Sequence, residues 1–268
     1  MMSAYSRSPL ALRRLAFLFL SALCLPLMAE EPSPAQGPPI LEASLQGLAD
    51  FGSSPLKLRS QDAAWLIPSA LGVGLLLNND VSFMAQLSKG AARKDWLDQS
   101  MPAVSQAGEG WVEAVVVLGG WAVGNERLAR TSMVALQGLA VSAVYTEAFK
   151  LALWSNRPSQ DDQQHRFFAY DQKSMGMPSG HSYSAFCLAE VYGAEYGRPI
   201  PYALAGVIAY SRIYNGAHWP SDVFVGSLLG ILTGVQTRHL AEANGAPRMR
   251  WSLAPRDDAT LLTAAIVF

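Results

Sequence analysis

The 268 residues are enough for one domain of ordinary to large size, and no long linker divides them into two independently packed halves. Hydrophobic residues make up 50% of the chain and charged residues 15%, and the mean hydropathy of +0.16 is high for a protein that lives entirely in water, so membrane association stays open. The formal net charge of −1 lacks a basic excess and gives no indication of a nucleic-acid partner.

Residues 1–29 have the pattern of a signal peptide. Arg13 and Arg14 precede a long apolar run, and Ala29 provides a cleavage junction. The chain is therefore expected to be exported from the cytoplasm. Leu27 is larger than the residue preferred at its place before the junction, so an uncleaved membrane anchor remains the alternative.

Residues 30–60 are rich in Pro, Ser and Gly, which predicts an extended leader onto the domain. Between residues 61 and 245, apolar residues recur at helical spacing, and this pattern predicts the packed domain. The predicted helices cover six stretches, at about 63–77, 109–124, 131–153, 182–196, 200–211 and 221–239. Six core helices with almost no strand pattern indicate an all-α fold, a helical bundle.

Most of these stretches are shorter than the ~20 apolar residues that a bilayer-spanning helix needs. Several also carry charges, among them Glu113, Glu147 and Lys150. Tightly packed core helices account for this pattern as well as spanning helices do. The sequence thus leaves open whether the helices cross a bilayer, lie on it or stand free.

Residues 246–268 have a different pattern from the rest of the chain. Met249, Trp251 and Leu253 alternate with polar or small residues, and residues 255–258 have the composition of a turn. A short C-terminal β-hairpin is one interpretation. We favour a tail packed on the helices or on a second subunit, because a single hairpin is marginally stable alone.

Lys150 and Arg157 stand seven residues apart in the first of three segments that concentrate cationic and imidazole groups. This spacing places both cations on the same side of a continuing helix, and Pro158 turns Arg157 out of helical geometry toward an exposed turn. A lone Lys or Arg is usually a solvated surface charge. Two cationic side chains that converge on the same place instead indicate an anion-binding site.

Pro178–His181 is the second segment, at the start of a predicted helix. Ser179 is a natural N-cap, Gly180 allows a ligand close to the backbone, and the free amides of the first turn can bind an anion. A Ser-Gly pair at a helix start is common without any ligand. This segment is therefore weak evidence unless it is combined with the others.

Ser211–Asp222 is the third segment, and it contains Arg212 and His218. Pro220 fits the first turn of a helix. Asp222 lies four residues beyond His218, so its carboxylate can reach one imidazole nitrogen, fix the tautomer and leave the other nitrogen free to attack. A His near an Asp is more often only a structural hydrogen bond, so this pair also depends on its neighbours.

Together, the three segments supply a nucleophile with its orienting acid, a second histidine, and three permanent cations with a helix N-terminus. Phosphoryl transfer needs this set, because its transition state spreads negative charge over the equatorial oxygens and fixed cations and amides stabilise that charge.

The order and spacing of the three segments resemble the signature of the type 2 phosphatidic acid phosphatase superfamily, which includes lipid phosphatases, bacterial acid phosphatases and vanadium haloperoxidases. The resemblance covers residues 150–222 and departs at no signature position. It implies that His218 attacks phosphorus, that Asp222 orients it, and that His181 protonates the leaving oxygen and then activates water. It also implies that five residues hold the phosphate oxygens: Lys150, Arg157, Ser179, Gly180 and Arg212.

No metal ion or other cofactor is expected. The Asp161–Asp162 and Asp257–Asp258 pairs fit solvated turns better than metal ligands, and His165 and His239 lack partners at ligand spacing. Four aromatic residues near the signature could line an apolar substrate entrance, although ordinary packing is the default interpretation: Trp154, Phe167, Phe168 and Tyr170.

The favoured hypothesis is a phosphatase of the periplasm or membrane of a bacterial envelope, which hydrolyses a phosphomonoester or diphosphate, preferably of a lipid, through a phosphohistidine. Its expected partners are a phosphorylated lipid or a small phosphate ester, and a membrane. One alternative is a soluble periplasmic acid phosphatase of broad specificity. A less favoured alternative is a haloperoxidase that binds vanadate at the same site. The oligomeric state is not determined by the sequence.

Overall fold

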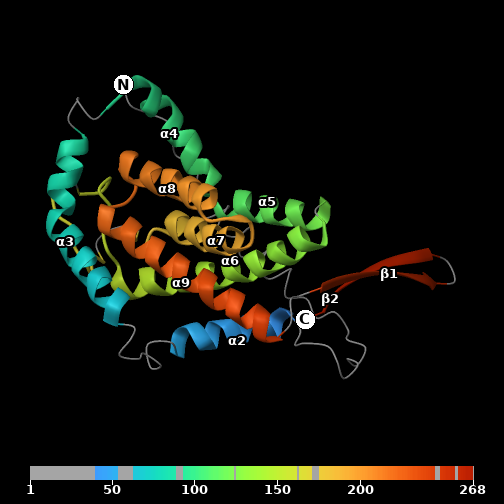
Figure 1. Cartoon of the computed structure of the whole chain (residues 1–268). Helices are drawn as coiled ribbons and strands as arrows, with labels where there is room; N and C mark the ends of the chain where they lie inside the picture. Colours follow the sequence, from blue (N-terminus) through green and yellow to red (C-terminus); the bar gives the residue numbers. More distant parts are fainter. Residues whose placement is uncertain are drawn as a thin grey trace. The chain divides into compact units, whose positions relative to one another are not determined.

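Helices make up most of the chain in the computed structural model (Figure 1). The structure describes residues 40–53, 63–88, 93–123, 125–161, 163–170, 175–244, 248–256 and 259–267. Its elements in these ranges are α2 (Ile40–Ser53), α3 (Ala63–Leu87), α4 (Asp95–Ala107), α5 (Gly110–Val123), α6 (Glu126–Leu153), α7 (Gly180–Tyr196), α8 (Pro199–Tyr214), α9 (Pro220–Asn244), β1 (Arg248–Arg256) and β2 (Ala259–Val267). The predicted all-α bundle is confirmed.

The six predicted helices correspond to α3 and α5–α9, and two more helices occur in the described ranges. Helix α2 covers part of the segment for which an extended leader is predicted, so the extended conformation is wrong for residues 40–53. Helix α4 was not predicted, because it contains Pro102 and its polar and apolar residues do not recur at a clear helical spacing. The predicted signal peptide, residues 1–29, lies outside the described residues.

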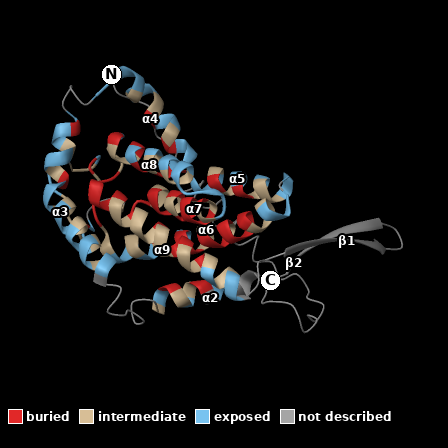
Figure 2. Cartoon of the chain, viewed as in Figure 1, coloured by how far each residue is buried: buried red, intermediate tan, exposed pale blue. Residues whose placement is uncertain are grey.

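Helix α7 lies inside the bundle. It packs against α6, α8 and α9, and its buried residues lie on several of its sides. Buried residues gather on α6, α7 and α9 (Figure 2). A helix enclosed on several sides needs small or apolar residues all round, and for this reason α7 has no clear polar stripe.

Three glycines, Gly226, Gly230 and Gly234, form a stripe at four-residue spacing on the face of α9 that contacts α7. A Cβ on Gly230 would lie 2.3 Å from the carbonyl oxygen of Tyr183, and one on Gly226 would lie 2.5 Å from that of Ser179. The two helix backbones are therefore in direct contact. This contact brings the beginning of α7 beside the beginning of α9.

Helix α3 exposes many of its large apolar side chains, including Leu71 (63% exposed) and Leu75 (66% exposed). By length and composition, Ala64–Leu87 is the one candidate membrane span in the described part of the chain, with a mean hydropathy of 1.2. Its single charged residue, Asp80, is fully buried. Helix α3 packs on α9, so Asp80 lies on its inner face.

Strands β1 and β2 pair antiparallel, with Arg248 opposite Val267 and Arg256 opposite Ala259. The C-terminal segment therefore forms the β-hairpin that the sequence offers as one interpretation.

Glu113 of α5 is buried, and in the described part of the chain neither of its carboxylate oxygens meets a partner in good hydrogen-bond geometry; the Ser184 side chain only moderates the effect of burial. Burial raises its pKa to about 8. Because the folded state then binds a proton that the unfolded state has released, stability should fall as the pH rises from about 4.5 to about 8 and stay low above that.

Glu113→Gln is therefore expected to raise the free energy of unfolding by on the order of 2 kcal/mol at pH 9, and by much less at pH 5. Denaturant unfolding at the two pH values measures the difference. The matched control is Glu126→Gln, which changes an exposed carboxylate at the start of α6. An equal effect of both substitutions at pH 9 would contradict the prediction.

Candidate active site

The three cationic segments come together where α6 and α8 end and where α7 and α9 begin. The backbone N–H of Ser179, just before α7, donates to the backbone carbonyl of Asp222 in the first turn of α9, at 3.0 Å. The charges of Lys150, Arg157 and Arg212 all act on the His218 imidazole. The structure thus gathers the predicted site residues in one place.

His218 and Asp222 form a buried pair, with exposed fractions of 2% and 0%. His218 Nδ1 lies 3.4 Å from Asp222 Oδ2. The same Oδ2 accepts a hydrogen bond from the backbone N–H of Trp219 at 3.0 Å, which caps the N-terminus of α9. The N-terminus of α9, which begins at Pro220, therefore fixes the position of the Asp222 carboxylate. The carboxylate in turn orients the His218 ring, with Nδ1 toward Asp222.

Burial lowers the pKa of His218 well below its usual value, and the positive charges of Arg157 and Arg212 lower it further. Burial raises the pKa of Asp222, and the Trp219 N–H opposes that rise. The imidazole is therefore neutral in the absence of an anion. With its proton on Nδ1, facing Asp222, it presents the lone pair of Nε2.

Arg212 lies in the last turn of α8, and its Nη1 donates to the hydroxyl of Ser105 on α4. Burial and the charge of Arg157 lower its pKa to about 10, so it stays protonated at neutral pH. Buried cations that repel one another attract an anion strongly.

Lys150 and Arg157 do not share a continuing helix, so that part of the prediction is wrong. Helix α6 ends at Leu153, and Trp154 takes a left-handed conformation with φ of 41°. Arg157 lies in the following loop, where its Nε donates to the carbonyl of Met175 at 3.1 Å. The turn, and not the seven-residue spacing, brings the two cations to one site.

Ser179 occupies the N-cap position of α7, but its side chain makes no capping hydrogen bond. Its hydroxyl instead accepts a hydrogen bond from the Ser182 hydroxyl at 3.1 Å. The first-turn N–H groups of a helix have no partners within that helix. A Cβ on Gly180 would lie 3.9 Å from Lys150 Nζ, so the start of α7 faces a cation and can share an anion with it.

His181, in the first turn of α7, has a different environment from His218. Its Nε2 lies 3.3 Å from Glu109 Oε1. Burial lowers the pKa of His181 below its usual value, and the Glu109 carboxylate offsets only part of that shift. An imidazole with a neighbouring carboxylate can both give and take a proton, which suits a general acid and base. Glu109 was not singled out in the sequence, because it stands far from the signature segments.

Asn156 organises the loop between α6 and α7. It is fully buried; its Oδ1 accepts from the backbone N–H of Arg166, and its Nδ2 donates to the carbonyl of Gln164 at 2.8 Å. Its own carbonyl accepts from the indole Nε1 of Trp219 at 3.0 Å. The loop that carries Arg157 is thereby attached to the residue next to His218.

Asp80 and His165 also belong to this region, and the sequence did not place them there. His165 Nδ1 lies 2.8 Å from Asp80 Oδ2, and His165 Nε2 lies 3.6 Å from Asp222 Oδ1. A single acidic residue in an apolar helix usually has a polar partner, so the sequence offered a reason to include Asp80 among the candidate site residues. His165 carries no comparable pattern, because its partners are distant in the sequence.

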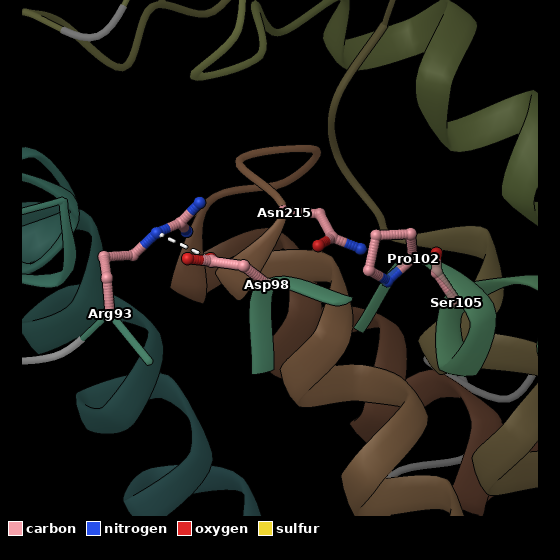
Figure 3. Close-up of a pocket in the computed structure, with 5 residues that line it drawn as sticks. All are labelled: Arg93, Asp98, Pro102, Ser105 and Asn215. Atoms are coloured by element: carbon pink, nitrogen blue, oxygen red, sulfur yellow. Dashed lines mark ion pairs between the residues drawn. The ribbon is translucent and has the colours of Figure 1, made fainter. Parts of the chain in front are cut away.

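A pocket of about 490 Å³ adjoins the site (Figure 3). Its lining residues are Arg93, Asp98, Pro102, Ser105 and Asn215. Arg93 Nε lies 3.1 Å from Asp98 Oδ1. Ser105 accepts the hydrogen bond from Arg212, so this polar pocket opens beside one of the site cations.

The aromatic residues of the loop after α6 divide into two groups. Phe167 stacks on His165, with ring centroids 4.9 Å apart. Phe168 and Tyr170 are exposed, and Tyr170 lies against Trp154 with centroids 5.4 Å apart. The exposed group forms an apolar surface near the site.

The described residues contain no group of three or more His, Cys, Asp or Glu side chains that could hold a metal ion. Asp161 accepts from the backbone N–H of Gln163 at 3.0 Å, as a turn residue does. Asp162, Asp257 and Asp258 lie outside the described residues.

Residues 131–246 match the PAP2 superfamily, which confirms the resemblance noted in the sequence. A lipid A 1-phosphatase of Porphyromonas gingivalis is 43% identical over 63 residues, which cover 21% of this chain and 14% of that protein. A decaprenylphosphoryl-5-phosphoribose phosphatase of Mycobacterium tuberculosis is 37% identical over 76 residues, which cover 28% of this chain and 41% of that protein. The chain thus spans less than half the length of these curated relatives.

Two solved structures are also similar. Aquifex aeolicus LpxE is 22% identical, with a TM-score of 0.44, and the match covers 60% of this chain and 94% of that chain. A transmembrane PAP2 type phosphatidylglycerolphosphate phosphatase from Bacillus subtilis is 17% identical, with a TM-score of 0.46, and the match covers 76% of this chain and 96% of that chain. Both matches are too distant to carry an argument about substrate.

Proposed function

We propose that the protein, whose residues 131–246 match the PAP2 superfamily, is a phosphatase that hydrolyses a phosphomonoester or diphosphate of a lipid through a phosphohistidine on His218. The observation that carries the proposal is the buried His218–Asp222 pair, with its Nδ1–Oδ2 distance of 3.4 Å, beside three cations whose charges act on His218. A neutral imidazole in a cationic, buried site is a nucleophile placed where a phosphate binds.

In the first step, Nε2 of His218 attacks phosphorus while Asp222 stabilises the positive charge that develops on the imidazole. The bond from phosphorus to the leaving oxygen breaks, and His181 donates a proton to that oxygen. In the second step, His181 takes a proton from water, the water oxygen attacks the phosphohistidine, and the nitrogen–phosphorus bond breaks. Inorganic phosphate leaves, and both histidines return to their starting states.

The phosphate oxygens would be held by Lys150, Arg157 and Arg212, together with the hydroxyl of Ser179 and the backbone amide of Gly180. These groups are fixed before the substrate arrives, so they stabilise the equatorial oxygens without reorganisation. Neither a metal ion nor a cofactor is required for either step. Arg93 and Asn215 line a neighbouring pocket that can take the polar part of a larger ester.

Three observations support a lipid over a small soluble ester. Helix α3 exposes apolar side chains along a length that can cross a bilayer. Phe168 and Tyr170 form an exposed apolar surface near the site. The curated relatives are named for the phosphates of lipid A and of a decaprenyl lipid. We therefore place the enzyme in the membrane or periplasm of a bacterial envelope, after export.

The test measures phosphate release by the purified chain in detergent and EDTA, with an isoprenoid diphosphate and a small aryl phosphate as parallel substrates. We expect kcat/KM for the lipid to exceed that for the aryl ester by at least roughly tenfold, because apolar binding energy lowers the barrier only for the lipid. Equal or faster cleavage of the aryl ester would favour the broad-specificity acid phosphatase. Loss of all activity in EDTA would contradict the metal-free mechanism.

A further inference from the structure

Asp80 joins helix α3 to the first turn of α9. Its Oδ1 accepts from the backbone N–H of Ser221 at 3.0 Å, and its Oδ2 accepts from the Ser221 hydroxyl. The same Oδ2 lies 2.8 Å from His165 Nδ1. Ser221 directly precedes Asp222, so Asp80 holds the backbone that carries the carboxylate facing His218.

Packing on both faces of the His165 ring holds its side chain in one orientation. Its ring stacks between Phe167 and Trp219, with centroids 4.9 Å and 5.1 Å away and interplanar angles of 29° and 18°. Only 3% of its side chain is exposed. With Nδ1 directed at Asp80, the other nitrogen, Nε2, faces Asp222 Oδ1 at 3.6 Å.

The Asp222 carboxylate therefore lies between two imidazoles. Three buried atoms at this place have no hydrogen-bond partner: His165 Nε2, Asp222 Oδ1 and His218 Nδ1. His165 Nε2 faces the unpartnered Oδ1 of Asp222 at 3.6 Å, whereas His218 Nδ1 lies 3.4 Å from Oδ2, which already accepts from the Trp219 N–H. A movement of a few tenths of an ångström would close both contacts to hydrogen-bond length, roughly 2.7–3.2 Å. Unpartnered buried atoms that point at each other indicate a network that closes when the site is occupied.

A proton on His165 Nε2 is directed at Asp222 Oδ1, because Nδ1 of the same ring faces Asp80. A hydrogen bond to the charged form of a carboxylate stabilises that form, so this donor favours the ionised state of Asp222. It opposes the repulsion that the Asp80 charge exerts on Asp222. The other charged groups that act on Asp222 are Arg157 and Lys150.

We propose that Asp80 and His165 are positioning residues of this active site: they extend the His218–Asp222 pair into the chain Asp80–His165–Asp222–His218, in which His165 donates to Asp222 and keeps it ionised and turned toward the nucleophile. The proposal rests on the proposed function for its catalytic consequence. Neither residue touches the substrate. The geometry of the chain does not depend on which ester is cleaved.

The decisive variants are His165→Ala, which removes the donor, and His165→Gln, which keeps an N–H at the end of the side chain. His239→Gln is the matched control, since His239 is an exposed histidine of α9. We expect His165→Ala to lower kcat on the aryl phosphate by roughly 10–100-fold with KM within about twofold of the wild type. We expect His165→Gln to recover most of that loss.

The pH profile separates positioning from mere packing. Without the donor, Asp222 takes up a proton more easily, so the acid limb of kcat should move to higher pH in His165→Ala and return in His165→Gln. A variant with a lower melting temperature but unchanged kcat and pH profile would show that His165 only packs, and would overturn the proposal. So would an equal loss of kcat in both variants.

A measurement that does not depend on catalytic turnover tests this proposal independently of the proposed function. The chain has four histidines, so ¹⁵N-histidine NMR signals can be assigned by single substitutions. We expect Nε2 of His165 to carry a proton, and its signal to move in Asp222→Asn but not in His239→Gln. A deprotonated Nε2 would overturn the chain of contacts even in an active enzyme. A protonated Nε2 in a protein that releases no phosphate would instead contradict the proposed function alone.

Discussion

Replacing His218 with alanine is expected to lower phosphate release by at least about 10⁴-fold, because covalent catalysis loses its nucleophile and the remaining site can only bind and polarise the ester. The His165 ring also faces Asp222, but its Nε2 points at Oδ1 of Asp222 and its Nδ1 points at Asp80, so neither nitrogen is left to attack phosphorus. Single-turnover phosphate release, with thermal unfolding to show that the variant is folded, measures the effect.

His239→Ala is the control for this loss, because it removes an exposed histidine from α9, the helix that follows His218. Rapid quenching of the wild type with a ³²P-labelled ester should trap label as an acid-labile, base-stable phosphohistidine, absent from His218→Ala. Label that remains in His218→Ala and disappears in His181→Ala would reverse the roles of the two histidines. Full activity in His218→Ala would exclude the mechanism.

Gly230→Ala is expected to lower the free energy of unfolding by about 2 kcal/mol, through overpacking between α7 and α9. The new Cβ would lie 2.3 Å from the Tyr183 carbonyl oxygen and 3.0 Å from the Cys187 nitrogen, and backbone atoms cannot move aside as a flexible side chain can. Helix propensity alone predicts the opposite sign, a gain of roughly 1 kcal/mol. Denaturant unfolding therefore distinguishes the two by the sign of the change.

Gly206→Ala is the matched control, because Gly206 lies within α8 and its added Cβ would meet no atom within 4 Å. It should be neutral or slightly stabilising. Gly230→Ala should also lose activity in its folded fraction, since any separation of α7 from α9 moves His181 away from His218. If Gly230→Ala were as stable as Gly206→Ala, the two backbones would not be in contact in solution.

Helices were predictable where apolar residues recur without interruption, as in α6, α7 and α9. The prediction failed for α2, because a composition rich in Pro, Ser and Gly resembles a linker, and for α4, because Pro102 lies inside a mostly polar helix. It also ended α3 too early, at residue 77 rather than Leu87, and so left Asp80 outside the helix. Local composition reports local preference, and packing against α8 or α9 overrides it.

The sequence by itself determined the residues with chemistry and their local geometry. Asp222 reaches His218 because four residues and a Pro-initiated helix separate them, and such contacts depend only on nearby backbone. Only the tertiary structure decided that Lys150 faces the start of α7, that glycines allow α7 to touch α9, and that Asp80 and His165 meet Asp222. The physical reason is that these contacts join residues far apart in the chain, whose distances are set by the close packing of whole helices.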